Sequence, residues 1–199
     1  MTSRCIASPF LVLALALPFA GCQKAADAAT PPNDPAGNSA GDPAAGSSAE
    51  SRNEEFLALG IGYSFAPPLD NIVCSGQMKP EQFDKLKAAG IERVICLRDS
   101  KEKGTGWEEE RAAAAGIEFI RMPISGKTGI TKDSANELSK KLDPAVRTLV
   151  ACGSSNRVGA LFALRAQIGG ATPEESLALG KACGLTRLEP VVKQALGMQ

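Results

Sequence analysis

Residues Thr148–Leu161, with the sequence TLVACGSSNRVGAL, decide the fold of this chain. An apolar, β-branched run leads to Cys152, four small or polar residues follow, and Arg157 then opens an apolar pattern with helical spacing. The segment therefore predicts a strand, a tight loop and a helix. The backbone N–H groups of such a loop converge at a helix N-terminus, which is a favourable place for an anion.

Two side chains of this segment add chemistry to the anion-binding loop. The N-terminal end of a helix lowers the pKa of a cysteine from about 8.5 to about 3.5–7.5, which produces a nucleophilic thiolate. The planar guanidinium of Arg157 is suited to a phosphate or sulfate oxyanion. The residues between the two are Gly153, Ser154, Ser155 and Asn156. The segment thus favours a site that binds and attacks an oxyanion ester.

Other blocks of the sequence resemble one family in their order and spacing. These blocks are Ser75–Gln77 followed by Pro80–Phe83, then Gly90–Arg98, then Ala115–Phe119. Together with the cysteine loop they resemble the cysteine-dependent phosphatase superfamily. Within it they are most similar to the small domains related to dual-specificity phosphatases and found in beta-lactamase-hydrolase-like proteins. The resemblance extends over roughly residues 56–195.

The resemblance implies a reaction and a role for each site residue. Cys152 would attack phosphorus, Arg157 and the amides of residues 153–156 would hold the oxygens, and an aspartic acid would protonate the leaving oxygen. Asp99 is the candidate acid, because it closes the strand expected beside that of Cys152, and Glu102 is its alternative. The substrate would be a phosphorylated small molecule or protein. No cofactor and no metal are implied.

The chain departs from the family pattern at four places. Ala151 stands where a histidine usually precedes the cysteine, Ser155 replaces a central glycine, and Val158 replaces a hydroxyl residue after the arginine. The usual place of the acid holds Pro123–Gly126, including Ser125, with no carboxylate. These departures keep open an alternative in which the domain only binds an anion or a partner. The short loop also leaves a rhodanese-like sulfurtransferase as a minority alternative.

Composition excludes several function classes. The chain has 22 basic and 22 acidic residues, one Trp, one Tyr and no histidine. The absence of histidine removes His-based metal sites and Ser/His triads, and without a basic patch no nucleic-acid partner is expected. Four of the six cysteines fall in the expected domain, with no Cys-x-x-Cys pair: Cys74, Cys96, Cys152 and Cys183. A redox alternative pairs Cys152 with Cys96 or Cys74 in an oxidising compartment.

The N-terminal region predicts export and anchoring. Residues 1–21 have an apolar stretch too short for a mature membrane span and end in small residues, as a signal peptide does. Cys22 follows as in a bacterial lipoprotein box, which predicts a lipid anchor facing the periplasm or the cell surface, the only membrane contact expected. Residues 22–53 are rich in Ala, Gly, Pro and Ser, and we interpret them as a disordered tether. Residues 54–199 would form the phosphatase-like domain.

Strand-like and helix-like segments alternate along this domain, which predicts an α/β fold with a mostly parallel sheet and helices on both faces. The expected strands are 60–65, 71–74, 93–97, 117–122 and 146–151. The expected helices are 80–90, 107–115, 131–142, 157–168, 173–183 and 189–196. Ligands of such folds bind at the carboxyl ends of the strands, where loops 64–70, 98–106 and 123–131 would form the rim.

Overall fold

The computed structural model describes residues 49–198. The expectations for residues 1–21, for Cys22 and for the tether up to residue 48 lie outside this range. The helices and strands are α1 Ala49–Ala58, β1 Ile72–Ser75, α2 Pro80–Phe83, β2 Arg93–Cys96, α3 Glu108–Ala115, β3 Glu118–Arg121, α4 Lys132–Lys141, β4 Thr148–Ala151, α5 Asn156–Ile168, α6 Pro173–Ala182 and α7 Glu189–Ala195. Within this part of the chain, no helix is both long and apolar enough to cross a bilayer.

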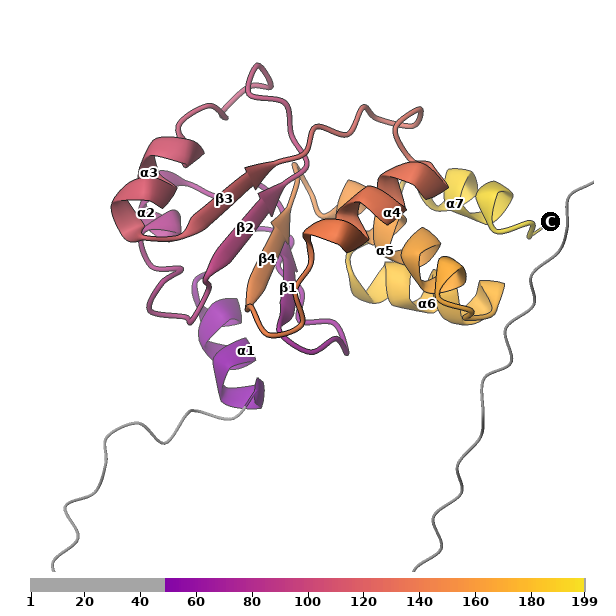
Figure 1. Ribbon diagram of the computed structural model, residues 1–199, viewed down its shortest axis with the longest axis horizontal. Coiled ribbons are helices and arrows are strands. Elements are labelled where there is room, and N and C mark those ends of the chain that lie inside the picture. The colour runs from indigo at the N-terminus through magenta and orange to yellow at the C-terminus, as the bar shows by residue number, and fades with distance from the viewer. Residues whose placement is uncertain (1–48, 199) are drawn as a thin grey trace, which may run out of the picture. The chain divides into compact units, whose positions relative to one another are not determined.

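The strands form one parallel sheet in the order β1-β4-β2-β3 (Figure 1). β4, which leads to Cys152, is a central strand, and all four of its residues are buried. Continuous burial of this kind is expected of a parallel strand covered on both faces. The α/β fold class predicted from the sequence is confirmed, and Cys152 follows the carboxyl end of a central strand.

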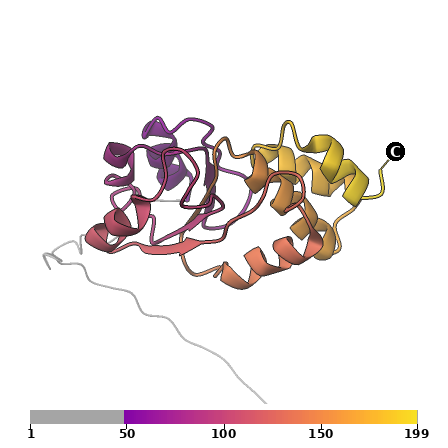
Figure 2. The same cartoon turned by 90° about the horizontal axis from the view of Figure 1, so that it is seen from above.

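Helices cover both faces of the sheet, as Figures 1 and 2 show. Alternate strand residues divide between the two faces: Val73, Val94 and Leu149 pack with α1, α2 and α3. Their neighbours Cys74, Ile95 and Val150 pack under α4, α5, α6 and α7. Because side chains alternate along a strand, Cys152 lies on the same face as Val150, beneath α5.

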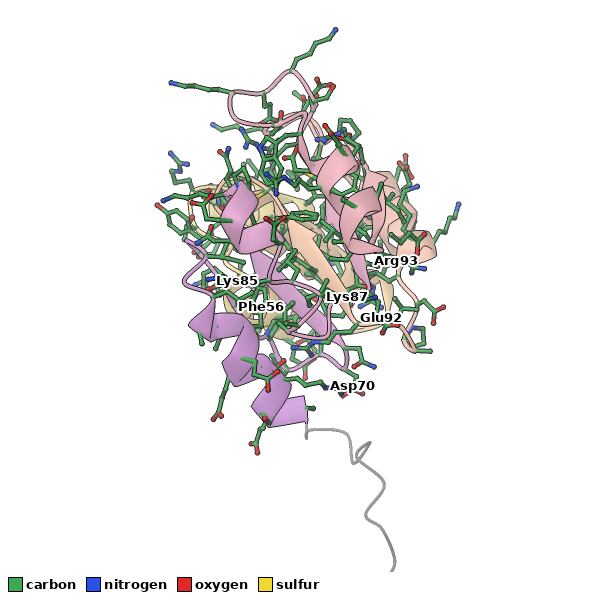
Figure 3. The ribbon with its side chains drawn as sticks, turned by 90° about the vertical axis from the view of Figure 1, so that its left-hand side faces the viewer. Phe56, Asp70, Lys85, Lys87, Glu92 and Arg93 are labelled. Atoms are coloured by element: carbon green, nitrogen blue, oxygen red, sulfur yellow. The ribbon has the colours of Figure 1, made fainter. Side chains whose placement is uncertain are left out.

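α1 begins before the expected domain boundary. The predicted tether extends to residue 53, whereas the helix starts at Ala49. Two tertiary contacts hold this helix: Phe56 is fully buried, on the side of the molecule seen in Figure 3, and Nη2 of Arg147 donates to the carbonyl oxygen of Arg52 at 2.8 Å. Composition does not reveal such contacts, because they come from residues far along the chain.

Two other predicted elements differ from the structure. Residues 60–65 form no strand, because Gly60 and Tyr63 have φ values of 66° and 57°, which an extended strand does not allow. Only Phe65 makes an isolated antiparallel bridge, to Cys74. The predicted helix 80–90 ends at Phe83, and tight turns with i→i−3 hydrogen bonds continue to Gly90. The remaining predicted strands and helices are present with boundaries shifted by a few residues.

Candidate active site

The cysteine loop connects β4 to α5 through one left-handed residue. Ser155 has φ 55° and ψ −2° and precedes the first turn of α5. A non-glycine residue is strained in this region, where glycine is the residue without a steric penalty. Ser155 is fully buried, and its Oγ donates to the carbonyl oxygen of Cys183 at 2.8 Å. This hydrogen bond holds the loop in its conformation.

The turn after α6 packs tightly against Ser155. A Cβ atom added to Gly184 would lie 2.6 Å from the Cβ of Ser155, and Gly184 itself has φ 94°. Glycine is therefore required at position 184 for two independent reasons. The close approach fixes the turn 183–188 against the cysteine loop, so that turn becomes part of the site.

Cys152 and Arg157 line the same pocket, whose volume is about 530 Å³. We call it the sulfur-side pocket. Cys152 is only 2% exposed, and its backbone N–H donates to the carbonyl oxygen of Ser75 at 3.1 Å. Two other basic residues, Lys127 and Arg187, also line the pocket, and no carboxylate of the described part of the chain does. The remaining lining residues are Tyr63, Gly126, Gly153, Ser154, Asn156 and Leu188. The pocket is therefore suited to an anion that contacts the thiol.

Arg157 is fixed by four hydrogen bonds. Its Nη1 and Nη2 donate to the two carboxylate oxygens of Glu102, each at 2.8 Å. Nη1 also donates to the carbonyl oxygens of Leu97 at 3.3 Å and Ile124 at 2.9 Å. A bidentate pair of this kind sets the plane of the guanidinium. Arg157 therefore enters the pocket in one orientation, held by the loops that follow β2 and β3.

The pair with Arg157 determines the charge of Glu102. Hydrogen bonds from Arg157, and then from Arg98 and the N–H of Asp99, lower the pKa of Glu102 from 4.5 to about 2. The same carboxylate, helped by the charge of the Cys152 sulfur, raises the pKa of Arg157 against the opposing effect of burial. The ion pair with Arg157 thus favours the charged form of Glu102. Both carboxylate oxygens of Glu102 accept from Arg157, so the structure favours a positioning role for Glu102 over the alternative role as general acid.

Asp99 lies on the other flank of Arg157. It lines a neighbouring pocket of about 480 Å³ together with Glu102, Arg157 and residues 123–126; we call this the carboxylate-side pocket. Asp99 is exposed, and its Oδ1 accepts from the backbone N–H of Lys101 at 2.8 Å. Among residues 49–198 Asp99 forms no ion pair. The structure places it beside Arg157 and not in the pocket that contains Cys152.

The residues that depart from the family pattern offer the sulfur few hydrogen bonds. Val158 is fully buried in the core beneath α5 and has no hydroxyl. Ala151 packs on the opposite face of the sheet. Ser125 lines the carboxylate-side pocket. Backbone N–H groups and Arg157 are therefore the groups available to stabilise a thiolate at position 152.

The other three cysteines of the domain are buried free thiols. Cys96 pairs in register with Ala151, so its side chain lies on the face opposite to Cys152, and the predicted pairing of those two is wrong. Cys74 shares a face with Cys152 and contacts Cys183. Burial, followed by a hydrogen bond with Cys183, raises the pKa of Cys74 well above its usual value. Neither Cys74 nor Cys183 lines the sulfur-side pocket.

Three residues of the site could not be assigned from the sequence. Lys127 lies inside one predicted rim loop, but nothing marked it among the lysines of the chain. Arg187 lies in a turn that was not expected at the rim, and Tyr63 lies in a segment predicted to be a strand. The one sequence signal that could have indicated the turn of Arg187 is Gly184, because a glycine just after a helix suggests a tight turn. Among the described residues no cluster of metal-ligating side chains is found.

Solved structures resemble the fold at low sequence identity. A DUF442 protein from Shewanella putrefaciens, provisionally classed as a phosphatase, superposes with a TM-score of 0.53 and 17% identity, covering 72% of this chain and 96% of its own. Tk-PTP in its active form superposes with a TM-score of 0.52 and 14% identity, covering 68% of this chain and 97% of its own. The catalytic core of the Saccharomyces cerevisiae PP-IP phosphatase SIW14 superposes with a TM-score of 0.51 and 16% identity, covering 67% of this chain and 83% of its own. No family model matches this sequence, and no curated protein matches it.

These neighbours define the class of fold. They are cysteine-dependent phosphatases of the dual-specificity type, and their structures superpose on the α/β fold of this chain. The fold resemblance predicted from the sequence is confirmed. The chain has a cysteine-phosphatase fold.

Proposed function

We propose that this chain is a cysteine-dependent phosphatase that hydrolyses phosphoesters. The observation that carries the proposal is that Cys152 and Arg157 line one pocket, without a carboxylate, at the N-terminus of α5. Fixed N–H donors and a guanidinium would stabilise the charge that develops on the phosphoryl oxygens. The phosphatase fold of the neighbours supports the same chemistry.

The proposed reaction has two steps. The Cys152 thiolate attacks phosphorus, so an S–P bond forms while the bond from phosphorus to the leaving oxygen breaks. The leaving oxygen points past Arg157 towards the carboxylate-side pocket, from which Asp99 gives it a proton, and Arg157 holds two phosphoryl oxygens. Water then attacks phosphorus and gives a proton to the Asp99 carboxylate while the S–P bond breaks, so inorganic phosphate leaves and both the thiolate and the acid are restored. Covalent catalysis of this kind replaces one difficult hydrolysis by two easier steps.

Hydrolysis of p-nitrophenyl phosphate tests the proposal. Reduced protein with EDTA should turn over this substrate, and Cys152→Ser should abolish turnover. Cys96→Ser is the matched control, because Cys96 is a buried thiol on the opposite face of the sheet. A phosphorylated Cys152 trapped by rapid quench and mapped by mass spectrometry would be direct support. No turnover by the wild-type protein between pH 5 and 8 would overturn the proposal.

One observation favours a second candidate, a module that binds anions without turnover. Both guanidinium Nη atoms already contact Glu102, and Val158 supplies no hydroxyl to the sulfur. In that case the wild-type protein would bind inorganic phosphate, Cys152→Ser would bind it equally well, and no phosphocysteine would form. The quench experiment therefore distinguishes the two candidates.

We further propose that the domain is attached to a bacterial membrane through lipidated Cys22. The support is the sequence alone: a short apolar signal followed by a cysteine, then a spacer without large apolar residues. Cys22→Ser should move the protein from the membrane fraction to the soluble fraction of the cell. Equal fractionation of the two proteins would overturn this part of the proposal.

A further inference from the structure

Two basic side chains in the sulfur-side pocket have no partner among residues 49–198. Lys127 and Arg187 line the pocket with Cys152 and Arg157. In the described part of the chain, neither side chain forms an ion pair. Neither donates a hydrogen bond there, whereas several other lysines and arginines do. Arg157 differs from both, because Glu102 already balances its charge. The pocket therefore contains, besides Arg157, two cationic groups whose charge is not balanced by a carboxylate of the described residues.

The backbone on each side of Arg187 is held by the anion-binding loop. Oδ1 of Asn156 accepts from the N–H of Thr186 at 2.8 Å and from the N–H of Leu188 at 3.3 Å. Asn156 is itself only 8% exposed. These two hydrogen bonds fix the position of the Arg187 backbone relative to Cys152.

The backbone near Lys127 is also attached to the site. Lys127 lies in a tight turn in which the N–H of Gly129 donates to the carbonyl oxygen of Ser125 at 2.6 Å. The carbonyl oxygen of Ile124, just before this turn, accepts from Nη1 of Arg157 at 2.9 Å. Both basic residues therefore stand on turns that are hydrogen-bonded to the cysteine loop, one at Asn156 and the other at Arg157.

The wall of the pocket includes an exposed aromatic ring. Tyr63 is 64% exposed, and its backbone lies in the left-handed region at φ 57°. A strained backbone at a pocket often supports a ligand-binding residue. The ring offers an apolar surface beside the two cations. The pocket thus has room and contacts for more than a single phosphoryl group.

From these observations we infer that the pocket takes substrates with two anionic groups. One phosphoryl group binds at Cys152 and Arg157, and a second anion binds Lys127 and Arg187. The body of the substrate lies against Tyr63. The inference rests on the proposed phosphatase function, and it assigns the substrate class to small bisphosphates or phosphorylated acids. Two unpaired cations attract such a dianionic group more strongly than they attract a neutral leaving group.

Two matched sugar phosphates test this inference. Fructose 1,6-bisphosphate and fructose 6-phosphate differ by one phosphate, so the ratio of their kcat/KM values measures the contribution of the second anion. We expect the wild-type protein to prefer the bisphosphate, and Lys127→Met and Arg187→Met each to lower the ratio about 10-fold, as for one lost charged hydrogen bond. Lys140→Met, at an exposed lysine on α4, is the control and should leave the ratio unchanged.

A binding measurement separates this inference from the proposed function. Calorimetry on the Cys152→Ser variant gives the affinity for both sugar phosphates without turnover. If the wild-type protein hydrolyses neither compound but the Cys152→Ser variant binds the bisphosphate more tightly, in a manner dependent on Arg187, only the catalytic proposal fails. If p-nitrophenyl phosphate is hydrolysed but Lys127→Met and Arg187→Met leave both the kcat/KM ratio and the affinities unchanged, the second anion site is wrong.

Discussion

The two flanks of Arg157 have opposite electrostatic character. On the carboxylate side, Glu102 pairs with the guanidinium and Asp99 lines the pocket. On the sulfur side, Lys127 and Arg187 are unpaired and no carboxylate is present. The counter-ion of the arginine thus lies outside the pocket that contains the thiol. A chain can in this way hold an arginine rigidly and still present a positive pocket to its ligand.

The largest expected effect follows from a change to the residue that separates the flanks. Arg157→Lys keeps the charge but loses the planar pair with Glu102, so it should lower kcat/KM for p-nitrophenyl phosphate by about 10²–10³-fold, as loss of a transition-state donor does. Steady-state kinetics on the folded protein checks this value. A loss smaller than threefold would mean that the geometry of the pair is unimportant.

A change to Asp99 is the next test, because it shows whether the carboxylate-side pocket supplies the proton that the leaving oxygen receives. Asp99→Asn should lower kcat for an alkyl phosphate such as β-glycerophosphate by about 10²-fold. The same variant should change kcat for p-nitrophenyl phosphate only a little, since p-nitrophenolate leaves without a proton. Equal losses with both substrates would indicate that Asp99 supports the loop and is not the acid.

A smaller effect on rate, about 10-fold, is expected for Glu102→Gln, which weakens the orientation of Arg157 without removing it. The clearest effect of this variant is expected on the stability of the fold at low pH. The pKa of Glu102 in the folded protein is about 2, below its ordinary 4.5, so the ion pair stabilises the fold above pH 4.5 and this stabilisation disappears as the pH falls towards 2.

Unfolding measured between pH 7 and pH 2 checks this expectation. The wild-type protein should lose more stability below pH 4.5 than Glu102→Gln does. Glu137→Gln, at an exposed pair with Lys141, is the matched control and should follow the wild-type curve. Identical acid unfolding of wild type and Glu102→Gln would show that the pair does not stabilise the fold.

The smallest effect on rate is expected at Gly159, behind the sulfur-side pocket. A Cβ there would collide with the backbone N of Leu185 and the carbonyl oxygen of Gly180, so Gly159→Ala should destabilise the fold by about 1–3 kcal/mol. Denaturant unfolding gives this value, with Gly62→Ala as the control because nothing lies within 4 Å of a Cβ at that position. An unchanged midpoint for Gly159→Ala would contradict the close packing of α5 on α6.

The sequence predicted most of the fold, because its signals are local. The β-branched run before Cys152 and the apolar pattern after Arg157 predicted β4 and α5, and both are present, at Thr148–Ala151 and Asn156–Ile168. The wrong predictions at residues 60–65 and at α1 arose because these segments are determined by contacts that are not local in the sequence. Left-handed φ values and the contact from Arg147 depend on residues distant in the sequence.

The site was predicted only in the part that lies within one segment. Cys152, Arg157 and the residues between them are consecutive, so their spacing predicted a common loop. Glu102 is 55 residues from Arg157 and was considered as an acid, because sequence position cannot show which partner holds a carboxylate. The pKa of a side chain follows from its neighbours in space, and the first of these for Glu102 is Arg157 of α5.

The sequence by itself determined the α/β class, the cysteine loop and the residue types that contact an oxyanion, since each depends on residues close together in the chain. Tertiary structure alone decided that Glu102 holds Arg157, that Cys96 faces away from Cys152, and that Lys127 and Arg187 share the pocket of the thiol. The physical reason is that a parallel sheet brings the loops after its strands to one edge. The charges that meet there are separated in sequence by whole helices.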